Sequence, residues 1–274
     1  MQNLKISSTS GYLELSDLPH NCIFNKVITG CGGTTIVLFN NEQYVIAVPT
    51  TELITNKTNL TESGVATITS PEGKAIKVFG LFGIFSYQVK KELKEYLEGD
   101  GIKKIICTYD KLPKLKEYLE PKDYRLLVDE YHTLLKAYSY RYSAIDGVLG
   151  CFRDYKSFCF MSATPIDTEF KPKALEGVEE IKADWDSIDT LLVKLERTNH
   201  PYTKAANIIN AYKQDGYITI DGVKSYEAYF FINSVTDIAS ILQYCNLTKD
   251  EVKIVCADNE QNDTVSLSVS DAGH

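Results

Sequence analysis

The chain lacks several features that would assign it at once to a well-known class. Its 274 residues include seven cysteines, an odd number, with no closely spaced Cys-x-x-Cys pair. Most of these cysteines lie in apolar runs, so we expect buried, reduced thiols instead of a disulfide framework or a zinc site. No apolar run is long enough to span a membrane, and residues 1–6 lack the core of a secretion signal. A cytoplasmic protein is therefore expected.

Positive charge is also scarce. Lysine and arginine number 29 against 37 aspartate and glutamate residues, which gives a formal net charge of −8. This balance excludes a general nucleic-acid coat protein, so any nucleic acid must be held by a local patch. With 44% hydrophobic and 24% charged residues, the composition is that of an ordinary globular protein. The length is comfortable for two domains.

The central feature is residues 124–132, where an apolar run ends in two carboxylates. Leu126, Leu127 and Val128 precede Asp129 and Glu130. Such a run predicts a strand buried on both faces of a parallel sheet, and acids at its carboxyl end lie where open α/β sheets bind ligands. One carboxylate there can hold hydrated magnesium, and its neighbour can deprotonate an attacking water. The alternative is a strand that ends in two solvated acids.

A glycine-rich stretch provides the second feature. Residues 22–28 predict a short strand, residues 29–35 read Thr-Gly-Cys-Gly-Gly-Thr-Thr, and an apolar run at 36–39 predicts the start of a helix. A strand, glycine turn and helix in this order let backbone N–H groups surround an anion. A tight turn without a ligand is the alternative, because a glycine cluster alone is a weak signal.

In the rest of residues 22–165, short apolar runs typical of strands alternate with segments of helical spacing. The pattern predicts strands at 44–48, 104–107 and 157–161, an apolar stretch at 75–85, and helices at 87–97 and 132–155. This alternation predicts a mostly parallel, doubly wound α/β sheet.

A second α/β series is expected after residue 170. Its predicted strands are 178–183, 191–196, 228–232 and 252–256, and its predicted helices are 203–214 and 236–244. We expect Tyr229, Phe230 and Phe231 to belong to its core. Residues 261–274 are small and polar, which is typical of a tail.

Five short motifs occur in the order and rough spacing of superfamily 2 helicases. They lie at residues 29–34, 49–50, 108–109, 129–132 and 162–164, the last two reading Asp-Glu-Tyr-His and Ser-Ala-Thr. The chain thus resembles this DExD/H-box family. The resemblance implies a P-loop NTPase (RecA-like) ATP-binding domain over residues 1–170, and a partial second RecA-like domain over 176–274. It also implies NTP-dependent unwinding or remodelling of single-stranded DNA or RNA, with ATP and Mg²⁺ as cofactors.

The same resemblance assigns roles by position. Asp129 would hold the magnesium ion together with Thr34, and Glu130 would activate water. His132, Ser162 and Thr164 would link the nucleotide state to domain movement, and phosphoryl transfer needs such positioning and charge neutralisation. The implied nucleotide-binding residues are Thr29, Gly30, Cys31, Gly32, Gly33, Thr34 and Thr35. The implied nucleic-acid-binding residues are Pro49, Thr50, Thr108 and Tyr109.

Two departures from the family pattern stand out. Gly33 occupies the position of the phosphate-binding lysine, and Lys26 on the preceding strand is a poor substitute. The loop is similar to a lysine-free Gly-Cys-Gly-Gly-Thr-Thr loop of phage-encoded helicase-like proteins, for which the compartment would be the host cytoplasm. We therefore expect weak binding of ATP with magnesium, since the loop keeps its amides and lacks its lysine charge.

The second departure is the lack of a Gln-x-x-Gly-Arg stretch, which carries the arginine fingers in this family. The chain would then be an N-terminal piece whose partner is a C-terminal helicase region, with little ATP turnover by itself. The alternative is a catalytically degenerate helicase fold that binds nucleic acid or a protein partner without turnover.

Overall fold

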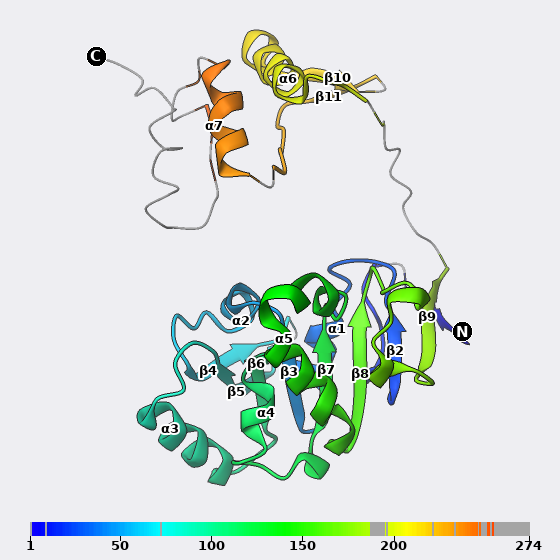
Figure 1. Cartoon of the computed structure of the whole chain (residues 1–274), viewed down its shortest axis with the longest axis vertical. Helices are drawn as coiled ribbons and strands as arrows, with labels where there is room; N and C mark the ends of the chain where they lie inside the picture. Colours follow the sequence, from blue (N-terminus) through cyan, green and yellow to red (C-terminus); the bar gives the residue numbers. More distant parts are fainter. Residues whose placement is uncertain are drawn as a thin grey trace. The chain divides into compact units, whose positions relative to one another are not determined.

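The computed structural model of the chain contains two compact units, residues 1–190 and 191–274. It describes residues 2–186 except 9 and 72, and residues 195–254 except 196, 221, 233, 246, 248–250, 253. Side chains of residues 136–140 and 220 lie outside this description. Each unit is described separately below (Figure 1).

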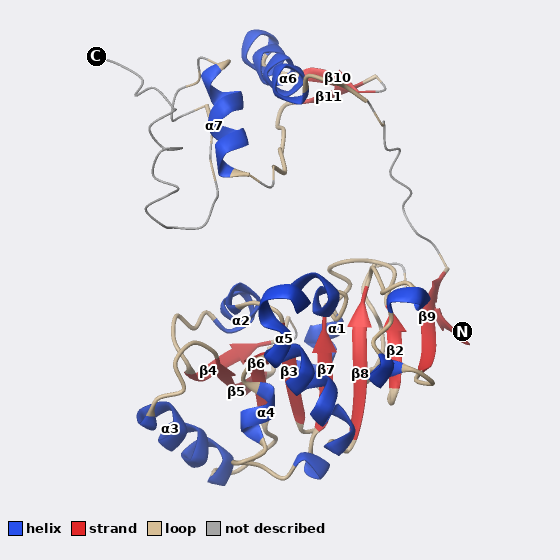
Figure 2. Cartoon of the chain, viewed as in Figure 1, coloured by secondary structure: helices blue, strands red, loops and turns tan. Residues whose placement is uncertain are grey.

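The first unit is built on one large sheet with helices on both faces (Figure 2). The sheet has nine strands in the order β1-β9-β2-β8-β7-β3-β6-β5-β4. The strands are β1 (Gln2–Ile6), β2 (Cys22–Asn25), β3 (Tyr44–Val48), β4 (Gly64–Thr69), β5 (Ala75–Leu81), β6 (Lys104–Thr108), β7 (Arg125–Asp129), β8 (Ser157–Ser162) and β9 (Glu179–Trp185). The α-helices are α1 (Gly33–Phe39), α2 (Thr51–Thr58), α3 (Tyr87–Glu98), α4 (Leu112–Leu115) and α5 (Thr133–Cys151).

Neighbouring strands of this sheet are parallel except for the antiparallel pair β4 and β5. In the centre, Leu127 of β7 is in register with Ile46 of β3 on one side and Cys159 of β8 on the other. The expectation of an α/β fold with a mostly parallel, doubly wound sheet is confirmed, and this architecture is compatible with a RecA-like domain.

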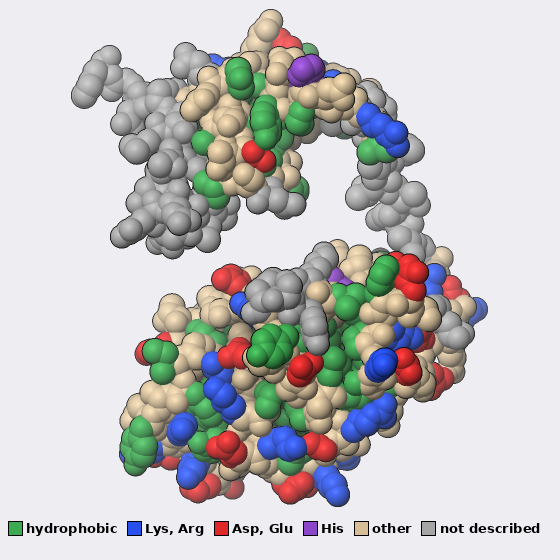
Figure 3. Space-filling model, in the orientation of Figure 1, with side chains coloured by type: hydrophobic (Ala, Val, Ile, Leu, Met, Phe, Trp, Pro, Cys, Tyr) green, Lys and Arg blue, Asp and Glu red, His purple; other side chains and the backbone are tan. Residues whose placement is uncertain are grey.

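Successive side chains of the central strands point to opposite faces of the sheet and form two separate cores. Leu126 and Val128 of β7 pack on the face covered by α3, α4 and α5. Leu127, between them, packs on the opposite face with residues of α1 and α2. Successive side chains of a strand point to opposite faces, so an uninterrupted apolar strand supplies both cores. Figure 3 shows acidic and basic side chains interspersed over the face of this unit that α3, α4 and α5 cover.

Three strands of this sheet differ from the sequence prediction. β1 and β4 were not expected, because both carry polar residues at an edge region of the sheet: β1 pairs only with β9, and β4 only with β5. Residues 178–183 were assigned to a second domain that would begin at 176. In the structure, residues 179–183 of this stretch belong to β9, which pairs with β1 and β2, and the first compact unit extends to residue 190.

The second unit contains α6 (Pro201–Asp215), the antiparallel hairpin of β10 (Ile218–Ile220) and β11 (Val223–Ser225), and α7 (Val235–Gln243). The helices predicted at 203–214 and 236–244 are confirmed. Their apolar residues Ala206, Ile241 and Leu242 form a small core with Cys245 and Leu247. Most residues of the strands predicted at 191–196 and 252–256 lie outside the described residues, so a RecA-like second domain stays a prediction.

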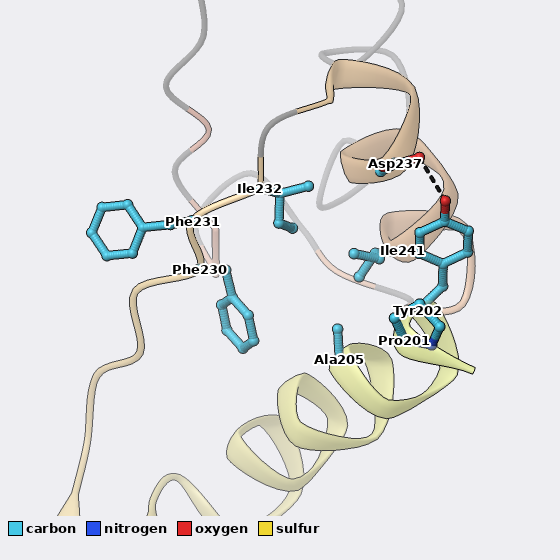
Figure 4. Close-up of a pocket in the computed structure, with 8 residues that line it drawn as sticks. All are labelled: Pro201, Tyr202, Ala205, Phe230, Phe231, Ile232, Asp237 and Ile241. Atoms are coloured by element: carbon cyan, nitrogen blue, oxygen red, sulfur yellow. Dashed lines mark hydrogen bonds between the residues drawn. The ribbon is translucent and has the colours of Figure 1, made fainter. Parts of the chain in front are cut away.

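The aromatic stretch before α7 was expected to be a core strand, and this is wrong. Residues 228–232 form no strand, and Tyr229 and Phe231 are 80% and 95% exposed. Phe230, Phe231 and Ile232 line a hollow of about 440 Å³ together with residues of α6 and α7. Phe230 and Ile232 are directed toward these helices, and the ring of Phe231 points away from them (Figure 4). Aromatic residues favour strands only when neighbouring strands cover them, and among the described residues none pairs with this stretch.

Candidate functional site

Five motifs follow five strands that lie side by side in the sheet. The strands β2, β8, β7, β3 and β6 are consecutive and mutually parallel. Carboxyl ends of parallel strands meet at one edge, where open α/β sheets bind their ligands. This carboxyl edge therefore gathers residues 29–35 after β2, 162–164 at β8, 129–132 at β7, 49–50 after β3 and 108–109 at β6.

The glycine loop, residues 29–35, connects β2 to α1. Gly30 and Gly32 adopt φ angles of 69° and 85°, a left-handed conformation that glycine tolerates without a steric penalty. The Cys31 carbonyl accepts a hydrogen bond of 2.8 Å from the Leu13 backbone N–H. Thr29 and Gly30 are exposed, Thr34 and Thr35 are half-buried in the first turn of α1, and Cys31 is buried.

A hydrogen bond joins the glycine loop to the acidic motif. The Thr34 hydroxyl donates to Oδ2 of Asp129 over 2.7 Å, across 95 residues of sequence. Asp129 is only 5% exposed. Burial raises the pKa of its carboxyl, against the opposing effects of Lys26 and of the Thr34 hydrogen bond. The two predicted magnesium-binding residues are thus in direct contact.

Glu130 pairs with a lysine that the sequence analysis discounted. Lys26 Nζ lies 2.8 Å from Oε1 of Glu130 and 3.8 Å from Oδ1 of Asp129. Burial lowers the pKa of Lys26, but the two carboxylates outweigh it and the pKa is raised, so the ammonium is charged. Glu130 itself adopts a φ of 51°, which is uncommon for a residue other than glycine and is a feature of functional sites.

The third motif contacts the second through a histidine. His132 Nδ1 lies 2.8 Å from the Ser162 hydroxyl and 3.3 Å from Oε2 of Glu130. The same Ser162 hydroxyl accepts a hydrogen bond of 2.9 Å from the Thr164 backbone N–H. All five residues of the predicted catalytic set are therefore brought together, with Glu130, His132 and Ser162 in a chain of contacts.

The predicted nucleic-acid-binding residues divide into two groups. Thr50 is exposed at the start of α2, and the carbonyl of Pro49 accepts a hydrogen bond of 2.8 Å from Arg141. Thr108 and Tyr109 are buried, at 6% and 3% exposure. The Tyr109 hydroxyl donates to the Asp129 carbonyl over 2.6 Å. Tyr109 is thus buried against the acidic motif, and nucleic-acid binding by Thr108 and Tyr109 stays a prediction.

Sequence reasoning discounted one site residue and missed another. Lys26 precedes the glycine loop, and only the fold shows that its side chain reaches the carboxylates. Tyr12, 59% exposed, lies beside Gly32, since a Cβ added to Gly32 would meet the tyrosine ring at 3.4 Å. It comes from residues 1–20, which carry no recognisable motif. A contact of this kind depends on how an irregular segment crosses the sheet edge, so no local signal predicts it.

The described residues contain no group of three or more histidine, cysteine, aspartate or glutamate side chains arranged to hold a metal ion. The Thr34 hydroxyl and the Asp129 carboxylate instead form a pair of oxygen donors. Magnesium prefers oxygen ligands and is commonly bound through one or two protein groups together with water and substrate phosphates. The donor set fits magnesium that arrives with a nucleotide.

Comparisons with known proteins do not identify a relative. No protein-family model matches the chain, and a search of curated proteins finds no significant match. Within the described part of the chain, no helix combines the length and apolar character needed to cross a bilayer.

Proposed function

We propose that the first unit is the nucleotide-binding domain of a superfamily 2 helicase-like NTPase, which acts on single-stranded DNA or RNA. The observation that carries the proposal is the hydrogen bond between Thr34 and Asp129. It joins a glycine-rich turn and an acidic strand end at the carboxyl edge of a parallel sheet. The order of the other motif loops on adjacent strands supports the same reading.

In this proposal the glycine loop binds the phosphates of ATP through its backbone N–H groups. Thr34 and Asp129 would hold Mg²⁺, which supplies neutralisation of phosphate charge when it is bound. Glu130 accepts the proton of the attacking water, and its position beside Lys26 and His132 fixes the carboxylate in place. These groups position the reactants and neutralise charge, and catalysis of phosphoryl transfer consists mainly of these two effects.

The contacts of His132 supply a route for coupling nucleotide state to nucleic-acid binding. Its ring touches both Glu130 and Ser162, and Ser162 in turn holds the start of the segment at 163–166. A change at Glu130 on hydrolysis would be transmitted to that segment through the histidine. Nucleic acid would lie on the exposed part of the carboxyl edge near Thr50, which is exposed beside the buried Pro49.

A second candidate function is nucleotide or nucleic-acid binding without turnover. The ion pair between Lys26 and Glu130 favours it, because the Oε1 atom of the carboxylate is already engaged by an ammonium.

One set of assays separates the two candidates. Phosphate release is measured with ATP and Mg²⁺, with and without single-stranded DNA or RNA, together with binding of a non-hydrolysable ATP analogue. Stimulated release that Glu130→Gln abolishes supports the NTPase. Analogue binding with no release under any condition supports the second candidate. A chain that binds neither the analogue nor single-stranded DNA or RNA contradicts both.

A further inference from the structure

The glycine loop has no space for a side chain at position 33. A Cβ built on Gly33 would lie 2.5 Å from Sδ and 2.8 Å from Cε of Met161. Met161 is fully buried in β8, in register with Phe24 of β2, so its side chain has little room to move. The Cβ of a lysine at position 33 would therefore clash with Met161 in the core of the sheet. The positive charge that nucleotide-binding loops of this kind place on the β- and γ-phosphates must come from another residue.

Lys26 is placed to supply that charge. Its ammonium and the Thr34 hydroxyl of the glycine loop contact the two oxygens of one carboxylate, Oδ1 and Oδ2 of Asp129, over 3.8 Å and 2.7 Å. The Lys26 side chain is 7% exposed. A lysine so deeply buried is rare unless it is paired, and here both partners belong to the site.

The backbone around Lys26 is held tightly. Its N–H donates to the Ser162 carbonyl over 2.9 Å, and its carbonyl accepts from Trp185 Nε1 over 3.0 Å. Val27, the next residue, adopts a φ of 65°, which is a genuine outlier for a β-branched side chain. Strain of this kind persists where the surrounding structure imposes it, and it concentrates at functional sites. This strained turn directly follows Lys26, whose side chain contacts the two carboxylates.

We propose that Lys26, at the end of β2, binds the nucleotide phosphates in place of a lysine in the glycine loop. This inference rests on the proposed nucleotide site. An ammonium on a flexible stem has three donors, so Lys26 can give one to phosphate oxygens and keep another on Asp129 or Glu130. The ion pair with Glu130 is then the nucleotide-free arrangement, and nucleotide binding releases the glutamate to act on water.

The competing role is structural, with Lys26 serving only as counter-ion to Asp129 and Glu130. Titration calorimetry with a non-hydrolysable ATP analogue and Mg²⁺ distinguishes the two roles, using wild type, Lys26→Met and Lys26→Arg. The matched control is Lys171→Met, since Lys171 is a largely buried lysine that pairs with Glu180 outside the site. Loss of one charge-assisted contact predicts about 10- to 100-fold weaker binding for Lys26→Met. Lys26→Arg should lose less, and Lys171→Met should bind as wild type does.

Glu130→Gln provides a second test, because it removes the Lys26–Glu130 ion pair by changing the carboxylate and leaves the lysine in place. If Lys26 contacts phosphate, this variant binds the analogue at least as tightly as wild type. If Lys26 only orients Glu130, then Glu130→Gln and Lys26→Met should change affinity alike, which would overturn the inference.

A third measurement needs no folded variant. An ATP acyl phosphate passes its acyl group to an amine that contacts the phosphates, and mass spectrometry of the wild-type chain locates the new amide. Acylation at Lys26 that excess ATP suppresses is the expected result. Wild type that binds the analogue while Lys26 is neither acylated nor needed for affinity contradicts the inference alone. Wild type that binds no analogue contradicts the proposed function as well.

Discussion

Lys26 Nζ lies 2.8 Å from Oε1 of Glu130, although the two residues are 104 positions apart in the sequence. The contact places a buried cation beside the group proposed as general base. It also brings the end of β2 to the end of β7, across the intervening strand β8. The fold therefore concentrates one positive and two negative side chains where phosphate and metal would meet.

Replacing Glu130 by glutamine tests its role as a base. The amide keeps the shape of the side chain but accepts no proton, so hydrolysis should fall about 10²- to 10⁴-fold. Binding of a non-hydrolysable analogue should persist. Glu180→Gln, which alters a glutamate paired with Lys171 outside the site, should leave both properties unchanged. Equal turnover by wild type and Glu130→Gln would remove Glu130 from the mechanism.

Gly33→Ala should destabilise the first unit. The new methyl group must displace Met161 in a packed core, and overpacking of this kind costs about 1–3 kcal/mol. Gly150→Ala is the matched control, because Gly150 lies in α5 with no atom within 4 Å of an added Cβ. Alanine favours a helix over glycine by about 1 kcal/mol, so this variant should be neutral or more stable. Urea unfolding measures the unfolding free energy of both variants. Equal values for Gly33→Ala and Gly150→Ala would show that the Met161 side chain moves aside at little cost.

Two tyrosines differ in what their buried hydroxyls contact. The Tyr109 hydroxyl donates to the Asp129 carbonyl over 2.6 Å. Among the described residues, the hydroxyl of Tyr155 is buried with no hydrogen-bond partner. Tyr109→Phe should therefore cost about 1–2 kcal/mol of unfolding free energy, and Tyr155→Phe should cost nothing or stabilise. Thermal or urea unfolding checks the order, and a larger loss for Tyr155→Phe would contradict the assigned contact.

Lys104 predicts a pH dependence of stability. Its ammonium contacts the Val37 carbonyl and the Asn40 side chain beneath α1, and burial lowers its pKa to about 7 from a usual value of 10.5. Between these two values the unfolded chain binds more protons than the folded one, so this residue makes stability rise with pH. The slope approaches about 1.4 kcal/mol per pH unit.

The measurement for Lys104 is the difference in unfolding free energy between wild type and Lys104→Met. Taking this difference at pH 7.5 and at about pH 9 removes the contributions of other groups. The unfolding free energy of the wild type should increase relative to that of Lys104→Met as the pH rises. A constant difference would mean that Lys104 stays charged in the folded state.

The central sheet was predictable because most residues of its strands are apolar. Residues 44–48, 104–107 and 157–161 carry side chains that suit burial on both faces, and they form β3, β6 and β8 nearly to the residue. The edge strands β1 and β4 mix polar and apolar residues, so their pairing depends on neighbours that only the fold supplies. Residues 228–232 show the reverse error, since strongly strand-favouring side chains form no strand without a neighbour.

The candidate site was predictable where a motif ends a strand. Asp129, Glu130 and Thr34 were placed correctly, because the carboxyl ends of parallel strands converge at one edge. Lys26 was discounted because the sequence does not show which groups its side chain reaches across the sheet. A left-handed residue, Val27, follows it, and the sequence has no glycine or asparagine at that position to indicate the turn. The burial of Tyr109 was not predicted, because a motif position does not reveal whether its ring is buried.

Magnesium-dependent nucleotide binding tests the central proposal most directly. A non-hydrolysable ATP analogue is titrated into the 274-residue chain by calorimetry, with Mg²⁺ and with a chelator, and again into Asp129→Asn. The account predicts saturable binding to one site that weakens when magnesium is removed. It also predicts that Asp129→Asn makes binding insensitive to magnesium, since the variant loses the carboxylate that pairs with Thr34. No binding by the wild type, or binding that ignores both magnesium and Asp129, would contradict the nucleotide site.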